Sequence, residues 1–570
     1  MPLTPNGKVD WRALPVPELS ARDSAPVHEA PATPMEETVA AVWAQVLRLE
    51  RVGREDDFFA LGGHSLLATQ VVARLRSALG VEVPLRTLFE ASSLRALAQQ
   101  VEHATRIQSL PALRPLPRGD RLPLSFAQQR LWFLDRLQPG GTEYNVPYVL
   151  RLDGPLDVSV LERAFSELVR RHEVLRTAFP EEGGAPVQRI APPAPVRIPI
   201  VEVGSQGASE VQRHVRAEVD RSFDLSHGPL LRPRLLKQDA RAHVLVVMLH
   251  HIVSDGWSAS VLLRELAALY AAFAQGLPSP LPELPVQYAD YALWQRGWLR
   301  DEALDAQVRY WRDALADSPR YLDLPTDRPR PAAQTFRGGV QRQSWPKSLW
   351  HRVEALARRE GATPFMVLLA AYQTVLWRYS GQGDISVGFP IAGRTHAETE
   401  GLIGLFANTL VLRARVHSEH AFRDLLAQVR EVTLGAYAHQ HVPFEKLVEA
   451  LQPERDLSRS PLFQVTLSLQ NTPVPEARLE QGLSLSVVDA QIQTSKFDLS
   501  MFVAEMPEGV SASVNYNSDL FEAKTAERML RQMRVLLEAA VARPETVLSE
   551  LPLMTAEERR RVVEEWSGRR

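Results

Sequence analysis

The feature that most constrains the fold is an uninterrupted apolar run that ends in two histidines. Residues 244–249 are all apolar, and a short run of this kind is typical of a fully buried strand. From Trp257 to Tyr270 apolar residues recur at helical spacing, with Ser258 as the expected start of the helix. The order predicts a buried strand, a short polar connection and an amphipathic helix.

The polar connection contains residues that suit catalysis. His250 and His251 are followed closely by Asp255 and Gly256. Because successive side chains of a strand point to opposite faces, we expect one histidine to face the core and the other a cleft. Polar groups of this kind are costly to bury without partners. The segment is therefore a candidate catalytic site; the alternative is that both histidines are satisfied core residues.

Length and composition exclude several classes of protein. A chain of 570 residues is too long for one hydrophobic core, so we expect three or four compact units. The net charge of −3 gives no support for nucleic-acid binding, and no apolar run of about eighteen residues could span a membrane. The absence of cysteine excludes disulfides and thiolate catalysis, and the fifteen histidines show no metal-ligand spacing. We therefore expect a cytoplasmic protein without a metal site.

Two proline-containing stretches, 17–34 and 105–121, have the composition of linkers. Residues 35–104 show four helical segments, which make one small bundle. Residues 122–553 alternate strand and helix patterns, and their length predicts two α/β lobes, 122–290 and 291–553. The expected elements here are strands 147–152, 244–250 and 384–388 and helices 158–170, 258–275, 363–379 and 525–541.

Ser65 stands between a glycine pair and a helical segment. Gly62, Gly63 and His64 precede it, and residues 66–79 have helical periodicity. A serine at this place is commonly an N-cap that accepts a backbone hydrogen bond. The alternative is covalent attachment of a phosphate-linked group, because a phosphodiester would lie against the positive end of the helix and its free amides.

The string from Asp57 to Leu66, DFFALGGHSL, resembles the modification motif of peptidyl carrier proteins. Further segments resemble, in order, the motifs of condensation domains from nonribosomal peptide synthetases. Two small departures occur, at His441 and Ala407, where the family commonly has Asp and Val. The segments are 125–132, 171–179, 250–256, 288–295, 403–410, 439–445 and 455–463.

The resemblance implies specific roles for the site residues. It makes Ser65 the attachment point of 4'-phosphopantetheine and His251 the catalytic histidine, and it leaves His250 structural. It implies that Asp255 is a structural acid paired with a cation, with Arg176 as first choice and Arg171 as second.

Three neighbouring residues are less constrained. Gly256 is expected to allow a turn or a close approach of the carrier arm, and Trp257 to pack in the core rather than contact substrate. Arg130 is expected either to line the channel or to lie on the surface.

The implied architecture is multidomain: a small four-helix carrier bundle followed by an α/β condensation domain of two chloramphenicol-acetyltransferase-like lobes in a V. Residues 1–16 resemble the end of an adenylation domain, in which Lys8 would be inactive without the rest of that domain. Residues 554–570 are expected to lead into a following domain. The implied partners are an upstream adenylation domain, downstream adenylation and acceptor carrier domains, and a phosphopantetheinyl transferase.

The resemblance implies peptide-bond formation, in which a donor acyl thioester is attacked by the amine of a downstream aminoacyl group. Heterocyclisation domains replace the HH…DG segment, and epimerisation domains usually follow a carrier with Asp rather than His64 before the serine. A non-catalytic recruitment module remains an alternative, although such modules tend to lose the second histidine. A free-standing acyltransferase that uses coenzyme A would not need a carrier in its own chain.

Overall fold

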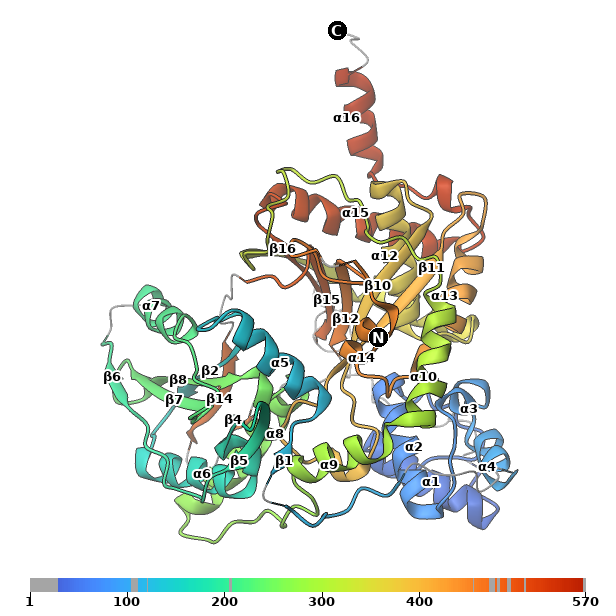
Figure 1. Ribbon diagram of the computed structural model, residues 1–570. Coiled ribbons are helices and arrows are strands. Elements are labelled where there is room, and N and C mark those ends of the chain that lie inside the picture. The colour runs from blue at the N-terminus through green and yellow to red at the C-terminus, as the bar shows by residue number, and fades with distance from the viewer. Residues whose placement is uncertain are drawn as a thin grey trace, which may run out of the picture. The chain divides into compact units, whose positions relative to one another are not determined.

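The structure is a computed structural model, and its elements are shown in Figure 1. It describes residues 29–103, 111–119, 121–204, 208–454, 456–470, 477–478, 482–488, 494–506 and 509–566. The expected segment 1–16 and most of the expected linker 17–34 lie outside the described residues. The chain forms two compact units, one with the four N-terminal helices and one with nearly everything from residue 107 onward.

Four helices form the smaller unit, as the sequence predicts. Thr33 caps the first helix by accepting a hydrogen bond from the Glu36 amide, and Gly80 ends the second in the left-handed conformation. Trp43 and Phe58 are fully buried and meet edge to face at 5.1 Å, which places the centre of the core under the loop between these helices. The helices are α1 (Pro34–Leu47), α2 (Ser65–Leu79), α3 (Leu85–Glu90) and α4 (Leu94–His103).

The larger unit begins with a lobe built on a six-stranded sheet in the order β13-β14-β2-β8-β7-β6. The predicted buried strand is its β8, which pairs antiparallel with both β2 and β7. Helix α6 packs against α8 over the same core. The elements are β2 (Asn145–Asp153), β6 (Ile200–Glu202), β7 (Leu231–Lys237), β8 (Ala242–His250), β13 (Ala477–Arg478), β14 (Ser484–Val488), α6 (Val158–Arg171), α7 (Ala208–Val219) and α8 (Gly256–Ala274).

A small sheet of two-to-six-residue strands joins β1, β5 and β3, with β4 paired to β5. Helix α5 carries a complete capping box from Ser125 and Gln128, so its start is strongly defined by local sequence. The elements are β1 (Leu122–Pro123), β3 (Thr177–Ala178), β4 (Glu181–Glu182), β5 (Ala185–Ile190), α5 (Phe126–Leu137), η1 (Glu173–Arg176) and η2 (His251–Val253).

The second lobe has a mixed six-stranded sheet in the order β11-β10-β12-β15-β16-β9. Its inner pairs, β10–β12 and β12–β15, are parallel, and helices α11, α12, α13 and α15 pack against it (Figure 1). The strands are β9 (Gly338–Pro346), β10 (Asp384–Ile391), β11 (Asn408–Arg415), β12 (Val465–Gln470), β15 (Leu499–Met506) and β16 (Gly509–Asn517). The helices are α9 (Tyr288–Trp298), α10 (Asp301–Ala314), α11 (Lys347–Arg359), α12 (Pro364–Ser380), η3 (Ala397–Thr399), α13 (Phe422–Ala438), α14 (Phe444–Leu451), α15 (Ala523–Ala542), η5 (Leu548–Glu550) and α16 (Ala556–Trp566).

The two lobes are not consecutive stretches of the chain, which differs from the predicted division at 290/291. That boundary falls inside α9, and strand β14, far downstream, pairs with β2 of the first lobe. Residues Leu402, Ile403 and Phe406 also lie in the core of the first lobe. Local patterns could not reveal these long-range crossings.

Among the described helices, none combines the length and the apolar character that a membrane span requires.

Candidate active site and carrier serine

His250 is the last residue of β8 and is a buried group. Its Nδ1 accepts a hydrogen bond from the Ile252 amide at 3.2 Å, and its ring lies 6.3 Å from that of Tyr144 and 6.0 Å from that of Phe223. Burial lowers the pKa of His250 to about 3, so the ring is neutral at physiological pH. His250 therefore lies in the core, and its structural role stays a prediction.

His251 begins the short helix η2, and its side chain stays partly exposed. Its backbone amide donates to the Tyr144 carbonyl at 2.9 Å, and its Nδ1 lies 2.7 Å from the Ser254 carbonyl oxygen. A carbonyl can only accept, so Nδ1 carries the proton and Nε2 keeps its lone pair. Burial and then the nearby Lys496 ammonium lower the pKa of His251 to about 4, which favours the neutral, proton-accepting ring.

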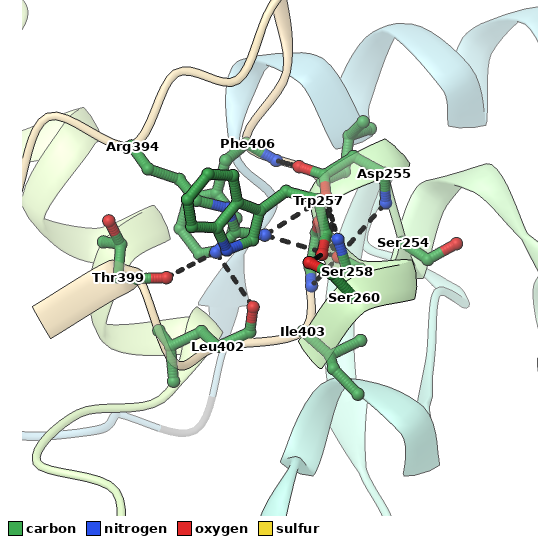
Figure 2. A network of polar contacts seen from close by, with 12 residues as sticks. Ser254, Asp255, Trp257, Ser258, Ser260, Arg394, Thr399, Leu402, Ile403 and Phe406 are labelled. Atoms are coloured by element: carbon green, nitrogen blue, oxygen red, sulfur yellow. Dashed lines mark hydrogen bonds and ion pairs between the residues drawn. The ribbon is translucent and has the colours of Figure 1, made fainter. Parts of the chain in front are cut away.

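Asp255 connects the histidine segment to the second lobe (Figure 2). It is the N-cap of α8, and its Oδ1 accepts from the amide and hydroxyl of Ser258 at 2.9 and 2.7 Å. Its Oδ2 accepts from the Phe406 amide at 3.0 Å, and Arg394 donates to Oδ1 at 3.1 Å. Asp255 and Arg394 are only 2% and 4% exposed. These contacts join Asp255 to the second lobe, and its structural role stays a prediction.

The predicted partners of Asp255 were wrong: the cation is Arg394, not Arg176 or Arg171. Arg176 follows α6 and donates to the carbonyls of Val169 and Ala191, which fastens the end of that helix. The reason is topological, because the start of α8 faces the segment after β10 of the second lobe.

Arg171 is instead held inside the first lobe by a different acid. Its guanidinium donates to Glu265 at 3.2 and 3.3 Å, and His172 lies 2.9 Å from the same carboxylate. All three side chains are buried. This cluster compensates the charge of Arg171 without any contribution from Asp255.

Gly256 does not provide the expected turn. It is the first helical residue of α8, its φ lies outside the left-handed region, and a Cβ added there would meet nothing within 4 Å. The open space leaves the expected close approach of a carrier arm as a prediction. Trp257 packs against the core of the first lobe and donates through Nε1 to the Glu400 carbonyl at 2.9 Å, in line with a packing role.

A pocket that is open to solvent lies between the two lobes. Its wall includes Phe406, whose amide donates to Asp255, and Glu445, whose pKa is raised by burial. Arg130 is half-buried near this wall, with its guanidinium 5.2 Å from the Phe444 ring, so it is not a free surface residue. No three metal-binding side chains gather into a candidate metal site within the described ranges.

Ser65 is the first helical residue of α2, and His64 rather than Ser65 is the N-cap. The interpretation of Ser65 as an N-cap is therefore wrong. The Ser65 side chain is only partly buried. Gly62 has a φ of +94°, and a Cβ on Gly63 would lie 2.4 Å from the ring and carbonyl of Phe58. Both glycines are needed to bring the serine to the helix end, where free amides suit a phosphodiester.

Arg394 and the backbone acceptors around it were missed by sequence reasoning. Arg394 donates to the Leu402 carbonyl at 2.9 Å and to the Thr399 carbonyl as well as to Asp255. The segment 403–410 lies beside Asp255, because the Phe406 amide donates to that carboxylate. A lone arginine 139 residues from its partner gives no local signal.

The chain matches two known families. The family described as "Condensation domain" matches residues 119–563, and the family described as "Phosphopantetheine attachment site" matches residues 37–101. The predicted architecture, a helical carrier unit followed by a two-lobed α/β domain with the chloramphenicol-acetyltransferase-like fold, is confirmed.

Similar proteins are peptide synthases and a related biosynthetic domain. Linear gramicidin synthase subunits C and D of Brevibacillus parabrevis are each 47% identical over 578 and 579 residues, which is 100% of this chain but only 7% and 11% of those proteins. The crystal structure of the X-domain from teicoplanin biosynthesis is 30% identical with a TM-score of 0.72, covering 78% of this chain and 100% of that one. The chain therefore belongs to the condensation-domain family of nonribosomal peptide synthetases, with a phosphopantetheine-attachment domain ahead of its condensation domain.

Proposed function

We propose that this chain forms an amide bond between a donor acyl group held on Ser65 and the amine of an acceptor aminoacyl group. The observation that carries the proposal is the 2.7 Å contact between His251 Nδ1 and the Ser254 carbonyl oxygen, from which the tautomer of His251 follows. Its Nδ1 is engaged by the Ser254 carbonyl, so Nε2 is the free acceptor on a side chain that remains partly exposed. Ser65 is the proposed attachment point because its hydroxyl lies at a helix N-terminus behind two glycines.

The phosphopantetheine arm, when attached, supplies the thiol that holds the donor as a thioester. His251 would accept the proton that the amine must lose during attack. An α-amine has a reference pKa of about 7.7–8.0, so roughly a tenth is already neutral at pH 7 and its first deprotonation is cheap. The more important proton is the one on the ammonium formed by attack, and the neutral ring of His251 can take it.

Positioning is expected to contribute more than proton transfer. General-base help is worth roughly 10²–10⁴-fold, whereas holding two reactants together can reach an effective molarity of about 10⁵ M or more. Asp255 and Arg394 serve positioning, because they fix the helix that follows His251 to the second lobe. His250 supports the same strand end from within the core.

The donor role follows from the order of the two domains, since the carrier precedes the condensation domain. We infer an upstream adenylation domain that loads Ser65, and downstream adenylation and acceptor carrier domains. A phosphopantetheinyl transferase would attach the arm. The shared family supports adenylation and carrier partners in general terms.

The experiment is reconstitution of the full chain, loaded on Ser65, with a loaded acceptor carrier, scored for dipeptide by mass spectrometry. His251→Ala is expected to lose at least about 100-fold in rate, the lower range for general-base help. His227→Ala, at an exposed position outside the site, is the control and should keep the parental rate. Ser65→Ala should prevent both the mass gain of the arm and product formation. Parental turnover by His251→Ala would refute the proposal.

A recruitment module is the second candidate, because a solved structure titled as a complex of the teicoplanin X-domain and OxyB is 30% identical to this chain. The neutral His251 with a free Nε2 favours catalysis over simple docking. The same assay separates the two functions, since a recruitment module would yield no dipeptide with any pair of loaded carriers.

A further inference from the structure

Lys496 places a positive charge beside the histidine pair. It lies just before β15 of the second lobe, and its Nζ is 4.2 Å from the centroid of the Tyr144 ring. Tyr144 precedes β2 of the first lobe, and its carbonyl accepts the hydrogen bond from the His251 amide. A cation–π contact therefore brings an ammonium of one lobe next to the backbone that holds His251 in the other.

No acidic side chain among the described residues pairs with the ammonium. Among the described residues, Lys496 forms no ion pair and no hydrogen bond, and the charges that act on its pKa are Arg130 on α5 and Glu143 beside Tyr144. Burial, followed by Arg130, lowers the pKa of Lys496 to about 8, which leaves most of the amine protonated at pH 7. A positive charge that is partly removed from water without a counter-ion is costly, and the face of an aromatic ring offsets only part of that cost.

The charges that face the two histidines come from several elements. Lys496 opposes protonation of His251, whereas Asp255 at the start of α8 favours it. The pKa of His250 is lowered by burial and then by the positive charges of protonated His251, Lys496 and Arg232 on β7. Of these charges, Lys496 has the largest effect on the pKa of His251, and it is therefore the group to test.

We propose that Lys496 is a positioning residue for condensation, whose fixed positive charge keeps His251 in the neutral form that accepts the amine proton. The inference rests on the proposed function of His251. The direction of the effect is defined, because a nearby cation disfavours the charged imidazolium form and lowers the pKa of His251. The neutral ring, which acts as the base, therefore persists to lower pH. A merely structural role, in which the Lys496–Tyr144 contact only joins the lobes, predicts no dependence of His251 titration on the charge.

The test measures the protonation of His251 directly in the full chain. Deuterium exchange at the imidazole C2 position, followed by mass spectrometry of the peptide that contains His251, reports the titration midpoint without requiring activity. His250→Asn, made in every background, removes the signal of the adjacent histidine from that peptide. Lys496→Met keeps the length of the side chain and removes its charge, Lys496→Arg keeps the charge, and Lys524→Met on the exposed face of α15 is the matched control.

Lys496→Met should raise the His251 midpoint by about 1 pH unit, while Lys496→Arg and Lys524→Met leave it at the parental value. The dipeptide rate of Lys496→Met should then fall relative to the parent by about twofold at pH 5 and remain comparable at pH 8. An unmoved midpoint in Lys496→Met, or an equal shift in Lys496→Arg, would overturn the inference. Failure of the proposed function is separate, since it shows as normal turnover by His251→Ala whatever the midpoints are.

Discussion

Asp255 carries a formal charge inside the protein, and its surroundings compensate that charge completely. Arg394 supplies the opposite charge, and the amides of Ser258 and Phe406 supply hydrogen bonds to the two carboxylate oxygens. Breaking a buried pair by removing one partner costs more than the pair contributes, because the remaining charge is left without compensation. The arginine would then lie 4% exposed, with two backbone carbonyls and the Ser258 hydroxyl as its remaining hydrogen-bond partners.

Asp255→Ala is therefore expected to lower the free energy of unfolding by about 3–5 kcal/mol and to lower the condensation rate as well. Urea unfolding followed by tryptophan fluorescence measures the stability. Asp153→Ala is the control, because Asp153 pairs with Arg151 on the surface and such pairs contribute at most about 1 kcal/mol. The double variant Asp255→Ala, Arg394→Met should lose less than the sum of the two single changes. Equal losses for Asp255→Ala and Asp153→Ala would contradict this account.

The order of strand, histidine pair and helix at this site could be predicted from the sequence, whereas the charged partners of Asp255 and His251 could not. The strand, the two histidines and the helix follow one another within a few residues, so their periodicity and spacing were visible locally. The partner of Asp255 comes from another lobe, and any of several arginines could have met it. Lys496 was missed for the same reason, since its neighbour Tyr144 is more than 350 residues away in the chain.

At the scale of elements, the segment between η3 and β11 is fastened to the first lobe at successive backbone positions. Ile403 donates to His172 Nδ1 at 3.3 Å, and the Gly404 amide donates to the Ser258 hydroxyl oxygen at 3.1 Å. The Gly404 carbonyl oxygen lies 3.0 Å from the same hydroxyl, so it shares the single hydroxyl proton with Asp255. The Tyr288 hydroxyl donates to the Leu405 carbonyl. Because these contacts all involve buried groups, the segment behaves as part of the first lobe's core.

Ser258→Ala should loosen this segment, because one hydroxyl serves Asp255 and both polar groups of Gly404. Unsatisfied buried groups cost about 1–3 kcal/mol each, so we expect a loss of about that size in stability and faster amide exchange at Gly404 and Phe406. Ser260→Ala, two residues further along α8, removes only a bond to the Trp257 carbonyl and is the control. Hydrogen-exchange mass spectrometry of residues 399–408 measures the difference. Equal protection in both variants would show that the hydroxyl is dispensable.

Most helices and strands were predictable because each has its own local signal. The predicted helix 158–170 is α6, 258–275 corresponds to α8, and 363–379 to α12, with ends shifted by only a residue or two. The start of α8 was misplaced because Asp255, not Ser258, is the cap, and the two exchange hydrogen bonds as a capping box. Strand β14 was not predicted, since five residues of modest periodicity give little signal without their partner strand.

At the scale of the whole condensation domain, the two lobes depend on each other for their completion. The sheet of the first lobe receives β14 from the C-terminal part of the chain, and its core receives Leu402, Ile403 and Phe406. The entropic cost of closing a loop grows only slowly with its length. The pairing of β14 with β2 is therefore favourable once the second lobe has formed. The first lobe should therefore be sensitive to changes more than 300 residues downstream of its own strands.

Leu485 and Val487 of β14 test this dependence, because they lie on the same strand and pair with neighbouring residues of β2, yet Leu485 is 4% exposed and Val487 is 47% exposed. Leu485→Asp buries an unpaired carboxylate and removes a core side chain, so it should cost more than about 3 kcal/mol and raise amide exchange in residues 149–152 of β2. Val487→Asp leaves its carboxylate in solvent and should change β2 exchange little. The two residues are two positions apart and so lie on the same face of β14, but only Leu485 belongs to the buried core of the first lobe. If both variants left β2 equally protected, the strand crossing would be a minor contact and the first lobe would be stable without it.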